Sequence, residues 1–221
     1  MNERGYLIED NVLSADECLN LLASIERSNS SHGRGGVRHL MTNSAVRNIA
    51  EDERLTTIAS RFLGREAIPY KATLFSKTGK ANWLVAWHQD MALPVVRYQL
   101  NPDWGPWSRK AGIDYVHAPA WALLRVAALR IQLDASDESN GPIRMIEGSH
   151  QHGVLSSNEI IDVARRGREI SGQTDVGGII AMSPLIVHAS SKAVSDKPRR
   201  VLHIEYADTL ELGPGIRLAI S

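Results

Sequence analysis

The sequence lacks most of the features that tie a protein to an oxidising compartment, a membrane or a polyanion. Its single cysteine, Cys18, cannot form an internal disulfide, so we expect a core thiol in a cytoplasmic protein. No run approaches the roughly 20 apolar residues of a membrane span, and the N-terminus lacks a basic stretch followed by an apolar one. The charges cancel, with 25 Lys and Arg against 25 Asp and Glu, so no broad field attracts nucleic acid. We therefore expect a small-molecule substrate and neither nucleic acid nor a membrane as a partner; the sequence does not indicate an oligomeric state.

The N-terminal part of the chain has the patterns of a short strand followed by helices. Gly5 to Glu9 is typical of a strand, and Ser14 with Glu17 matches a capping box before apolar residues at helical spacing. This pattern predicts a helix over roughly 14–27. Apolar residues recur at helical spacing again over 43–63, with a break near the middle, which predicts two short helices.

The remainder of the chain has the texture of a β-sheet. Short apolar segments separated by Gly, Pro, Asn or Asp predict strands. These segments are 68–76, 83–88, 122–133, 143–146, 178–182, 185–189 and 200–206. Because no crossover helices separate them, we expect an antiparallel sandwich or barrel, in a mainly β protein with N-terminal helices (α+β).

We expect the 221 residues to form a single domain. Residues 1–66 would pack on a core formed by 67–207, and 208–221 would be a C-terminal tail. An insert over 94–119 interrupts the strands, and loops of that length are usually functional or disordered, so this one is a candidate lid.

The strongest local signal for chemistry is His88-Gln89-Asp90 at the end of an apolar segment. Residues two apart on a strand project from the same face, so His88 and Asp90 can share one ion. Two histidines and a carboxylate leave open positions on a non-haem iron, and a second histidine is therefore needed. His188 follows the apolar run 185–187, and His203 lies within a later strand; either could complete the set.

Arg199 is a candidate anchor for a dicarboxylic co-substrate. A planar guanidinium pairs with a carboxylate through two hydrogen bonds, whereas lysine acts as a point charge. On residue type alone, Arg199 and Arg200 could equally be a solvated pair of arginines after Pro198.

Taken together, three motifs resemble the phytanoyl-CoA dioxygenase family of 2-oxoglutarate oxygenases. They are His88-Gln-Asp90, Asn140-Gly-Pro142 through Gly148-Ser-His150, and His188-Ala-Ser190 with Arg199. The resemblance covers roughly 67–207 and implies a double-stranded β-helix, the cupin-like jelly roll, with iron between its two sheets. It also implies that Fe(II), 2-oxoglutarate and O2 are the cofactor and co-substrates.

Carried over by position, the resemblance implies a role for each matching residue. His88, Asp90 and His188 match the iron ligands, Arg199 matches the arginine that binds the far carboxylate of 2-oxoglutarate, and Ser190 matches its hydroxyl partner. The aspartate of the family's ligand set is present at position 90, so the resemblance implies that this chain is not the halogenase variant, in which a small residue replaces it. The implied reaction is hydroxylation of an unactivated carbon of a small molecule, with release of succinate and CO2.

In the family, a polar side chain on the first core strand often reaches the co-substrate. Lys71 and Lys77 would share one face of that strand with Thr73 and Phe75, so both lysines are candidates, and the sequence does not choose between them.

The substrate cannot be named from the sequence. Residues on segments that could border the site are candidates for contacting it. The candidates are Gln89, Trp104, Arg38 and His39, with Trp83, Tyr98 and Trp107 on neighbouring segments. No basic cluster suited to the phosphates of coenzyme A stands out, and the arginines at 165, 166 and 168 predict the solvated face of a helix.

Two other functions use the same residues. A non-catalytic cupin-like protein would bind a metal and 2-oxoglutarate without turnover. A zinc hydrolase would use the same His-Asp-His ligands with a bound water, but the sequence offers no general base for that reaction, and Arg199 would have no role in it.

Overall fold

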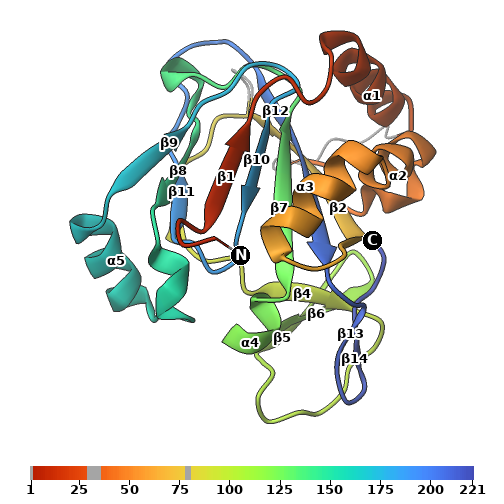
Figure 1. The fold of residues 1–221 in the computed structure, drawn as a ribbon, viewed down its shortest axis with the longest axis vertical. Helices are drawn as coiled ribbons and strands as arrows, with labels where there is room; N and C mark the ends of the chain where they lie inside the picture. The colour runs from red at the N-terminus through yellow and green to blue at the C-terminus, as the bar shows by residue number, and fades with distance from the viewer. Residues whose placement is uncertain (1, 29–35, 78–80) are drawn as a thin grey trace.

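The computed structural model describes residues 2–28, 36–77 and 81–221, and two antiparallel sheets form its centre (Figure 1). The larger sheet has the strand order β1-β10-β7-β12-β2. Its strands are β1 (Tyr6–Glu9), β2 (Ile68–Lys77), β7 (Val126–Gln132), β10 (Ile179–Met182) and β12 (Arg199–Ala207). The smaller sheet has the order β3-β11-β8-β9. Its strands are β3 (Val85–His88), β8 (Ile143–Ile146), β9 (Glu169–Gly172) and β11 (His188–Ser190).

Apolar side chains fill the space between the two sheets. Met145 on β8 and Ile180 on β10 belong to one buried cluster with Ala128 of β7. Leu129 and Ile131 point to the opposite side of β7 from Ala128, and they belong to a cluster on the other face of the larger sheet. Successive strand residues point to opposite faces, so a central strand covered on both sides must be apolar throughout, apart from residues that serve a site.

Three helices cover the outer face of the larger sheet (Figure 1): α1 (Ala15–Ser28), α2 (Ser44–Ala50) and α3 (Glu53–Leu63). The predicted capping box is confirmed, since the Ser14 N–H donates to Glu17 Oε2 at 2.8 Å and the Glu17 N–H donates to Ser14 Oγ at 3.2 Å. Cys18 is 1% exposed, as expected of a core thiol.

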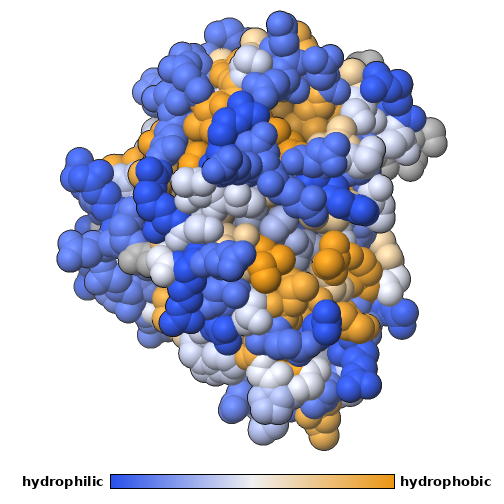
Figure 2. All heavy atoms as spheres, turned by 45° about the vertical axis from the view of Figure 1, so that its right-hand side comes forward, coloured by the Kyte–Doolittle hydropathy of each residue, from blue (hydrophilic) through white to orange (hydrophobic). Residues whose placement is uncertain are grey.

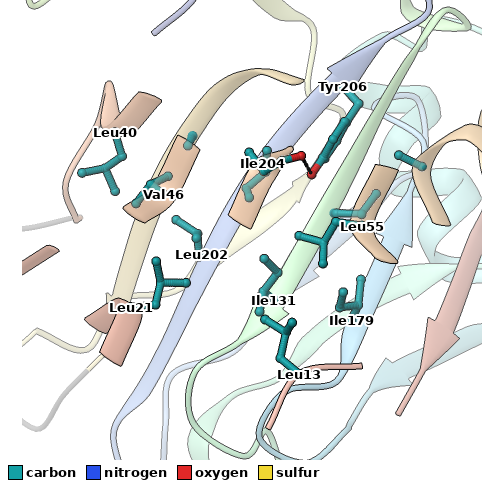
Figure 3. Packing of buried hydrophobic residues seen from close by; sticks show 14 of the residues in the cluster. Leu13, Leu21, Leu40, Val46, Leu55, Ile131, Ile179, Leu202, Ile204 and Tyr206 are labelled. Atoms are coloured by element: carbon teal, nitrogen blue, oxygen red, sulfur yellow. Dashed lines mark hydrogen bonds between the residues drawn. The ribbon is translucent and has the colours of Figure 1, made fainter. Parts of the chain in front are cut away.

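Figure 3 shows the apolar layer between these helices and the sheet, with Val46 and Leu55 facing Leu202 and Ile131. The Tyr206 hydroxyl donates to the carbonyl of Ala50 at 2.9 Å, which ties β12 to the end of α2. Burying such aliphatic side chains contributes roughly 1.5–3 kcal/mol each, so this layer supplies much of the stability that holds β12 in place.

The region expected to be an insert loop is itself folded. It contributes a three-stranded sheet, β4-β6-β5, and a short helix, α4, follows it. Their bounds are β4 (Ala92–Val95), β5 (Trp107–Lys110), β6 (Ile113–His117) and α4 (Ala120–Leu123). The prediction of a strand over 122–133 was therefore wrong at its start, because helix α4 occupies those first residues and β7 begins only at Val126.

The C-terminal residues also form structure that the sequence did not predict. They make the hairpin β13 (Glu211–Gly213) and β14 (Ile216–Arg217), whose Leu212 and Ile216 are 1% exposed. Helix α5 (Ser157–Arg166) follows β8 and carries two of the three predicted solvated arginines, Arg165 and Arg166, whereas Arg168 is exposed beyond the end of the helix. Three short 3-10 turns complete the elements: Leu40–Thr42, Glu138–Asn140 and Ser149–His152.

The surface is mostly hydrophilic on the face shown in Figure 2, where hydrophobic residues gather in separate areas. Among the described helices, none combines the length and apolar character needed to span a bilayer.

Candidate metal centre

Strands β3 and β11 bring His88, Asp90 and His188 together. His88 and His188 are directly opposite one another in the strand register, and their ring centroids lie 4.2 Å apart. Asp90 follows β3 and is fixed by its N–H, which donates to the carbonyl of Pro184 at 2.9 Å. Within the described parts of the chain, these three side chains form the one group arranged to hold a metal ion, with ligand atoms all within 4.8 Å of one another.

Hydrogen bonds to the main chain select which imidazole nitrogen faces the centre. His88 Nδ1 lies 2.8 Å from the carbonyl oxygen of Ala86, and His188 Nδ1 lies 2.9 Å from that of Ile186. A carbonyl accepts only from N–H, so the proton sits on Nδ1 and the Nε2 lone pair is free, as in metal-binding histidines. The two Nε2 atoms lie 3.7 and 3.5 Å from the Asp90 carboxylate oxygens.

The electrostatics suit metal binding as well. Burial lowers the pKa of His188 to about 4, so the ring is neutral at physiological pH. Burial acts to raise the pKa of Asp90, but the neighbouring His188 and His88 outweigh it and lower the pKa overall, so the carboxylate is ionised. Two imidazoles and a carboxylate match the donor set that binds non-haem iron.

His203, the alternative histidine, has both ring nitrogens engaged elsewhere. Its Nδ1 lies 3.2 Å from Arg130 Nη1, and its Nε2 lies 3.4 Å from Glu205 Oε1. Because Arg130 can only donate, Nδ1 is the acceptor and Nε2 carries the proton that faces the carboxylate. The geometry therefore groups His188, and not His203, with His88 and Asp90.

A cavity of about 230 Å³ opens beside the centre, and we call it the Arg199 lobe. Its walls include the three grouped side chains together with Lys77, Ser190, Arg199 and Arg130. Lys77 Nζ donates to Ser190 Oγ at 2.7 Å, and Arg199 Nη2 donates to the same oxygen at 3.3 Å. Lys77 and Arg199 are also direct cross-strand partners on β2 and β12, although like charges directly opposite one another destabilise a sheet.

The Arg199 lobe holds three buried cations without an acidic partner. Lys77, Arg199 and Arg130 are 2%, 4% and 8% exposed, and none has a carboxylate within ion-pair distance among the described residues. Burial, with repulsion from Arg199 and Arg130, lowers the pKa of Lys77 to about 8, and burial also lowers the pKa of both arginines. Among the described residues, the Nε atoms of Arg130 and Arg199 have no hydrogen-bond partner. Unpaired buried charge is costly, so this lobe is built for an anion.

A second cavity, of about 350 Å³, lies on the other side of His88 and Asp90, and we call it the Lys110 lobe. Lys71, Thr73, Lys110, Tyr115 and Glu205 line this lobe alone, and Arg38, Phe75 and His203 line both lobes. Lys71 Nζ forms an ion pair with Glu205 Oε1 at 2.7 Å, and the Tyr70 hydroxyl donates to Glu205 Oε2 at 2.6 Å. Lys71 is thus neutralised within the protein.

The sequence model of the family described as Phytanoyl-CoA dioxygenase (PhyH) matches residues 1–201. The chain belongs to this family. No curated protein sequence matches it.

Several solved structures share the fold of this chain. AviO1 from Streptomyces viridochromogenes Tue57 is 21% identical, with a TM-score of 0.67 over 98% of this chain and 93% of that one. EctD from S. alaskensis with bound Fe is 17% identical, with a TM-score of 0.68 over 99% and 84%. SnoN, an epimerase in complex with Fe3+, alpha ketoglutarate and nogalamycin RO, is 18% identical, with a TM-score of 0.71 over 96% and 84%. At these identities the likeness concerns the fold, and it confirms the predicted jelly roll.

The residues predicted to contact substrate in this PhyH-family chain separate into two groups. Arg38 lines both lobes, and Gln89 lines the Lys110 lobe. Gln89 is nevertheless committed to the main chain: its amide donates to the carbonyls of Gly153 and Leu185 at 2.8 and 2.7 Å and accepts from the Leu155 N–H at 2.9 Å. It therefore positions the segments around the centre.

Trp104 and His39 line neither cavity, so the structure does not place these two predicted substrate contacts in the walls of the site. Trp104 is 5% exposed and packs edge-on against Trp121 in a core cluster, where its large ring gains most from burial. His39 adopts a left-handed backbone conformation before the first 3-10 turn and lines neither lobe.

Two residues of the site were missed, although the sequence carried a signal for both. Arg130 on β7 and Glu205 on β12 are charged residues with large apolar neighbours on both sides in the sequence, and burial of such residues without a purpose is rare. Lys110 gave no such signal, because it ends a strand of polar and exposed residues.

Proposed function

We propose that this protein is an iron(II)- and 2-oxoglutarate-dependent oxygenase. The observation that carries the proposal is the Arg199 lobe, where Lys77, Arg199 and Arg130 lie buried without an acidic partner beside a His-Asp-His group. A dianionic keto acid would supply the missing negative charge while lying next to the metal. Membership of the PhyH family supports the same chemistry.

In this proposal His88, Asp90 and His188 hold the iron through two Nε2 atoms and one carboxylate oxygen. The bound iron supplies oxidation by O2, coupled to conversion of 2-oxoglutarate to succinate and CO2. The chain itself contributes binding, orientation and exclusion of water. The main-chain carbonyls of Ala86 and Ile186 contribute by holding both imidazoles in the metal-binding tautomer.

The far carboxylate of 2-oxoglutarate is assigned to Arg199 and Ser190, with Lys77 as the third donor. The support is their shared position: Lys77 and Arg199 both donate to Ser190 Oγ, and an anion that binds there gives both cations a charged partner in addition to this neutral hydroxyl. Lys71, the other lysine considered, is not assigned this role, because Glu205 already satisfies its charge.

Hydroxylation of an unactivated carbon of a small molecule is the reaction we propose. The structure of EctD with 2-oxoglutarate and 5-hydroxyectoine, a hydroxylated compound, supports this choice on the same fold. The SnoN epimerase of nogalamycin biosynthesis has that fold too, so the fold does not distinguish hydroxylation from epimerisation. The mass of the product distinguishes the two reactions. Hydroxylation adds one oxygen atom to the substrate, whereas epimerisation leaves its mass unchanged.

The zinc hydrolase alternative is weaker, because hydrolysis has no use for three unpaired buried cations beside the metal. A non-catalytic metal and 2-oxoglutarate binding protein would use them and is separated from an enzyme only by turnover. That alternative predicts tight 2-oxoglutarate binding with no succinate formed in the presence of any substrate.

The test is an anaerobic titration of the iron(II)-loaded protein with 2-oxoglutarate, monitored by visible absorption. We expect the weak charge-transfer band of a chelated keto acid in the wild type and its loss in His188→Ala. His203→Ala is the matched control, since it removes a buried imidazole next to both lobes and should keep the band. A folded, iron-loaded wild type without the band would contradict the proposal.

A further inference from the structure

The Lys110 lobe is built from two parts of the fold that meet at the metal centre. Strands β2 and β12 contribute Thr73 and Glu205, and the three-stranded sheet of the insert contributes Leu93, Lys110 and Tyr115. Because His88 and Asp90 also line this cavity, a molecule seated in it lies next to the metal ligands. A volume of about 350 Å³ suits a small organic molecule.

The charges in this lobe do not balance. Lys71 and Glu205 cancel one another, and Asp90 belongs to the metal centre. Lys110 and Arg38 remain, and neither has an acidic partner within ion-pair distance among the residues that the structure describes. A deeper polar group also lacks a partner, since the Thr73 hydroxyl is buried and makes no hydrogen bond.

Lys110 is held in place by local structure and is more than a solvated lysine. It pairs with Ile113 across a two-residue turn, and its Nζ lies 4.9 Å from the centre of the Tyr115 ring. Lys71 Nζ lies 5.6 Å from the same ring. Partial burial and repulsion from Arg38 and Lys71 lower the pKa of Lys110, as expected where cations gather without counter-charge.

We propose that the Lys110 lobe is the substrate site and that it selects a small organic molecule carrying a carboxylate or a phosphate, which Lys110 and Arg38 bind. This inference rests on the proposed function for the identity of the site, and it adds the chemical class of the substrate. The anionic group sits at the mouth, near the two cations. The apolar surface of Phe75, Met91 and Leu93 then contacts the organic part of the molecule near the metal ligands.

Arg109 offers a matched control for Lys110. The two residues are neighbours on β5 and so point to opposite faces of the sheet. Arg109 Nε lies 3.7 Å from Asp114 Oδ1, and Arg109 lines neither lobe. Lys110→Gln and Arg109→Gln therefore remove the same charge from almost the same place. Both side chains are exposed, so neither change disturbs the core.

The experiment measures binding of three probes to zinc-loaded protein saturated with N-oxalylglycine, an inert dicarboxylate analogue of 2-oxoglutarate that occupies the Arg199 lobe. The probes are 3-phenylpropanoate, phenyl phosphate and the neutral 3-phenylpropanamide, with dissociation constants from ligand-detected NMR. We expect at least one anion to bind about fivefold to tenfold more tightly than the amide, a modest factor because the mouth is exposed to solvent. The tighter of the two anions identifies the group.

In Lys110→Gln this preference should fall to about twofold or less, and in Arg109→Gln it should be unchanged. Arg38→Gln is a second variant that should reduce the preference in the same direction. Equal binding of the amide and both anions by the wild type would overturn the inference, as would a preference that survives in Lys110→Gln.

The loading step separates a failure of this inference from a failure of the proposed function. If N-oxalylglycine binds but the probes show no dependence on Lys110, the oxygenase proposal stands and the substrate class is wrong. If N-oxalylglycine does not bind, the oxygenase proposal fails. The probe series is then repeated on metal-free protein, where a preference that depends on Lys110 supports an anion site and its absence overturns it.

Discussion

The two lobes lie at opposite ends of one strand pair, and the lysine in each lobe faces a residue of opposite charge type across the strands: a cation in one lobe and an anion in the other. On β2 and β12, Lys77 is the cross-strand partner of Arg199, whereas Lys71 is the cross-strand partner of Glu205. The second pair is a buried ion pair at 2.7 Å, and the first places two like charges side by side. A fold can keep such a like-charged pair only at a cost in stability, and it does so where a ligand supplies the anion.

The same comparison extends along β12. Arg199, His203 and Glu205 lie on one face of that strand. A single segment therefore contributes Arg199 to the Arg199 lobe, Glu205 to the Lys110 lobe and His203 to both. In the Arg199 lobe the buried cations have no acidic partner among the described residues, and in our proposal the co-substrate neutralises them. In the Lys110 lobe the deep charge is neutralised internally, and only the mouth remains cationic.

The largest effect should come from the centre that both lobes share. Asp90→Ala removes the carboxylate between His88 and His188, so we expect metal affinity to fall by more than about 100-fold, beyond the loss typical of an outer-shell partner. Metal content after dialysis measures this. Asp114→Ala, which removes an acid paired with Arg109 at the surface, is the control. Retention of stoichiometric metal by Asp90→Ala would rule out the proposed ligand set.

The next effect distinguishes Arg199 from its neighbour. Arg199→Met should weaken 2-oxoglutarate binding to manganese(II)-loaded protein by about 10- to 100-fold, because charge-assisted hydrogen bonds contribute roughly 1.5–3 kcal/mol each. The same variant should not lose stability in the absence of ligand, since it relieves repulsion with Lys77.

Arg200→Met is the matched control for that experiment. Arg200 forms an ion pair with Asp134 at 2.7 Å, so this variant should lose stability to urea while binding 2-oxoglutarate normally. The reverse pattern, with Arg200 governing co-substrate affinity, would contradict the assignment of the Arg199 lobe.

A smaller effect should appear as a dependence on pH. The pKa of Lys77 is lowered to about 8 in the free protein, and a bound dianion would raise it again. Affinity for 2-oxoglutarate should therefore be complete below about pH 8 and fall above it, by about tenfold per pH unit at most. Burial lowers the pKa of Arg199 and Arg130 as well, but a guanidinium spreads its charge over the whole group and keeps its proton over this range.

Calorimetric titration of zinc-loaded protein between neutral pH and about pH 9.5 measures this dependence. Lys77→Met supplies the control, because it should bind more weakly at every pH with a nearly flat profile. A wild-type affinity independent of pH would show that Lys77 does not contact the co-substrate.

Sequence reasoning recovered those elements whose signal is local. The segment 143–146 was predicted with the bounds that β8 has, and the N-terminal helices were predicted from caps and periodicity. The insert strand β5 was missed, because Trp-Ser-Arg-Lys is mostly exposed and shows no apolar alternation. Helix α4 was missed because it is a single short turn of apolar residues that continues into a buried strand.

The site divides in the same way between local and long-range information. The spacing of two residues was enough to predict that His88 and Asp90 lie together, although β3 ends at His88 and Asp90 follows it. Choosing between Lys71 and Lys77 required the partner across the sheet, Glu205 or Arg199, and that register follows from pairing strands more than 120 residues apart in the chain. No local sequence pattern specifies this register.

The smallest expected change tests whether the Lys71 pair is as self-contained as the structure indicates. The double variant Lys71→Met/Glu205→Gln removes both charges, so affinity for 2-oxoglutarate in the Arg199 lobe should change by less than about twofold, since no net charge is removed. Lys71→Met alone should destabilise the fold by up to about 3–5 kcal/mol, because Glu205 would remain buried without its cation and would keep only its contacts with Tyr70 and His203. Urea unfolding of the single and double variants separates these costs. The double variant could instead lose 2-oxoglutarate affinity as strongly as Lys77→Met does. The Lys71–Glu205 pair would then contribute to binding in the Arg199 lobe, and the distinction between an internally neutralised lobe and a lobe that binds an anion would be wrong.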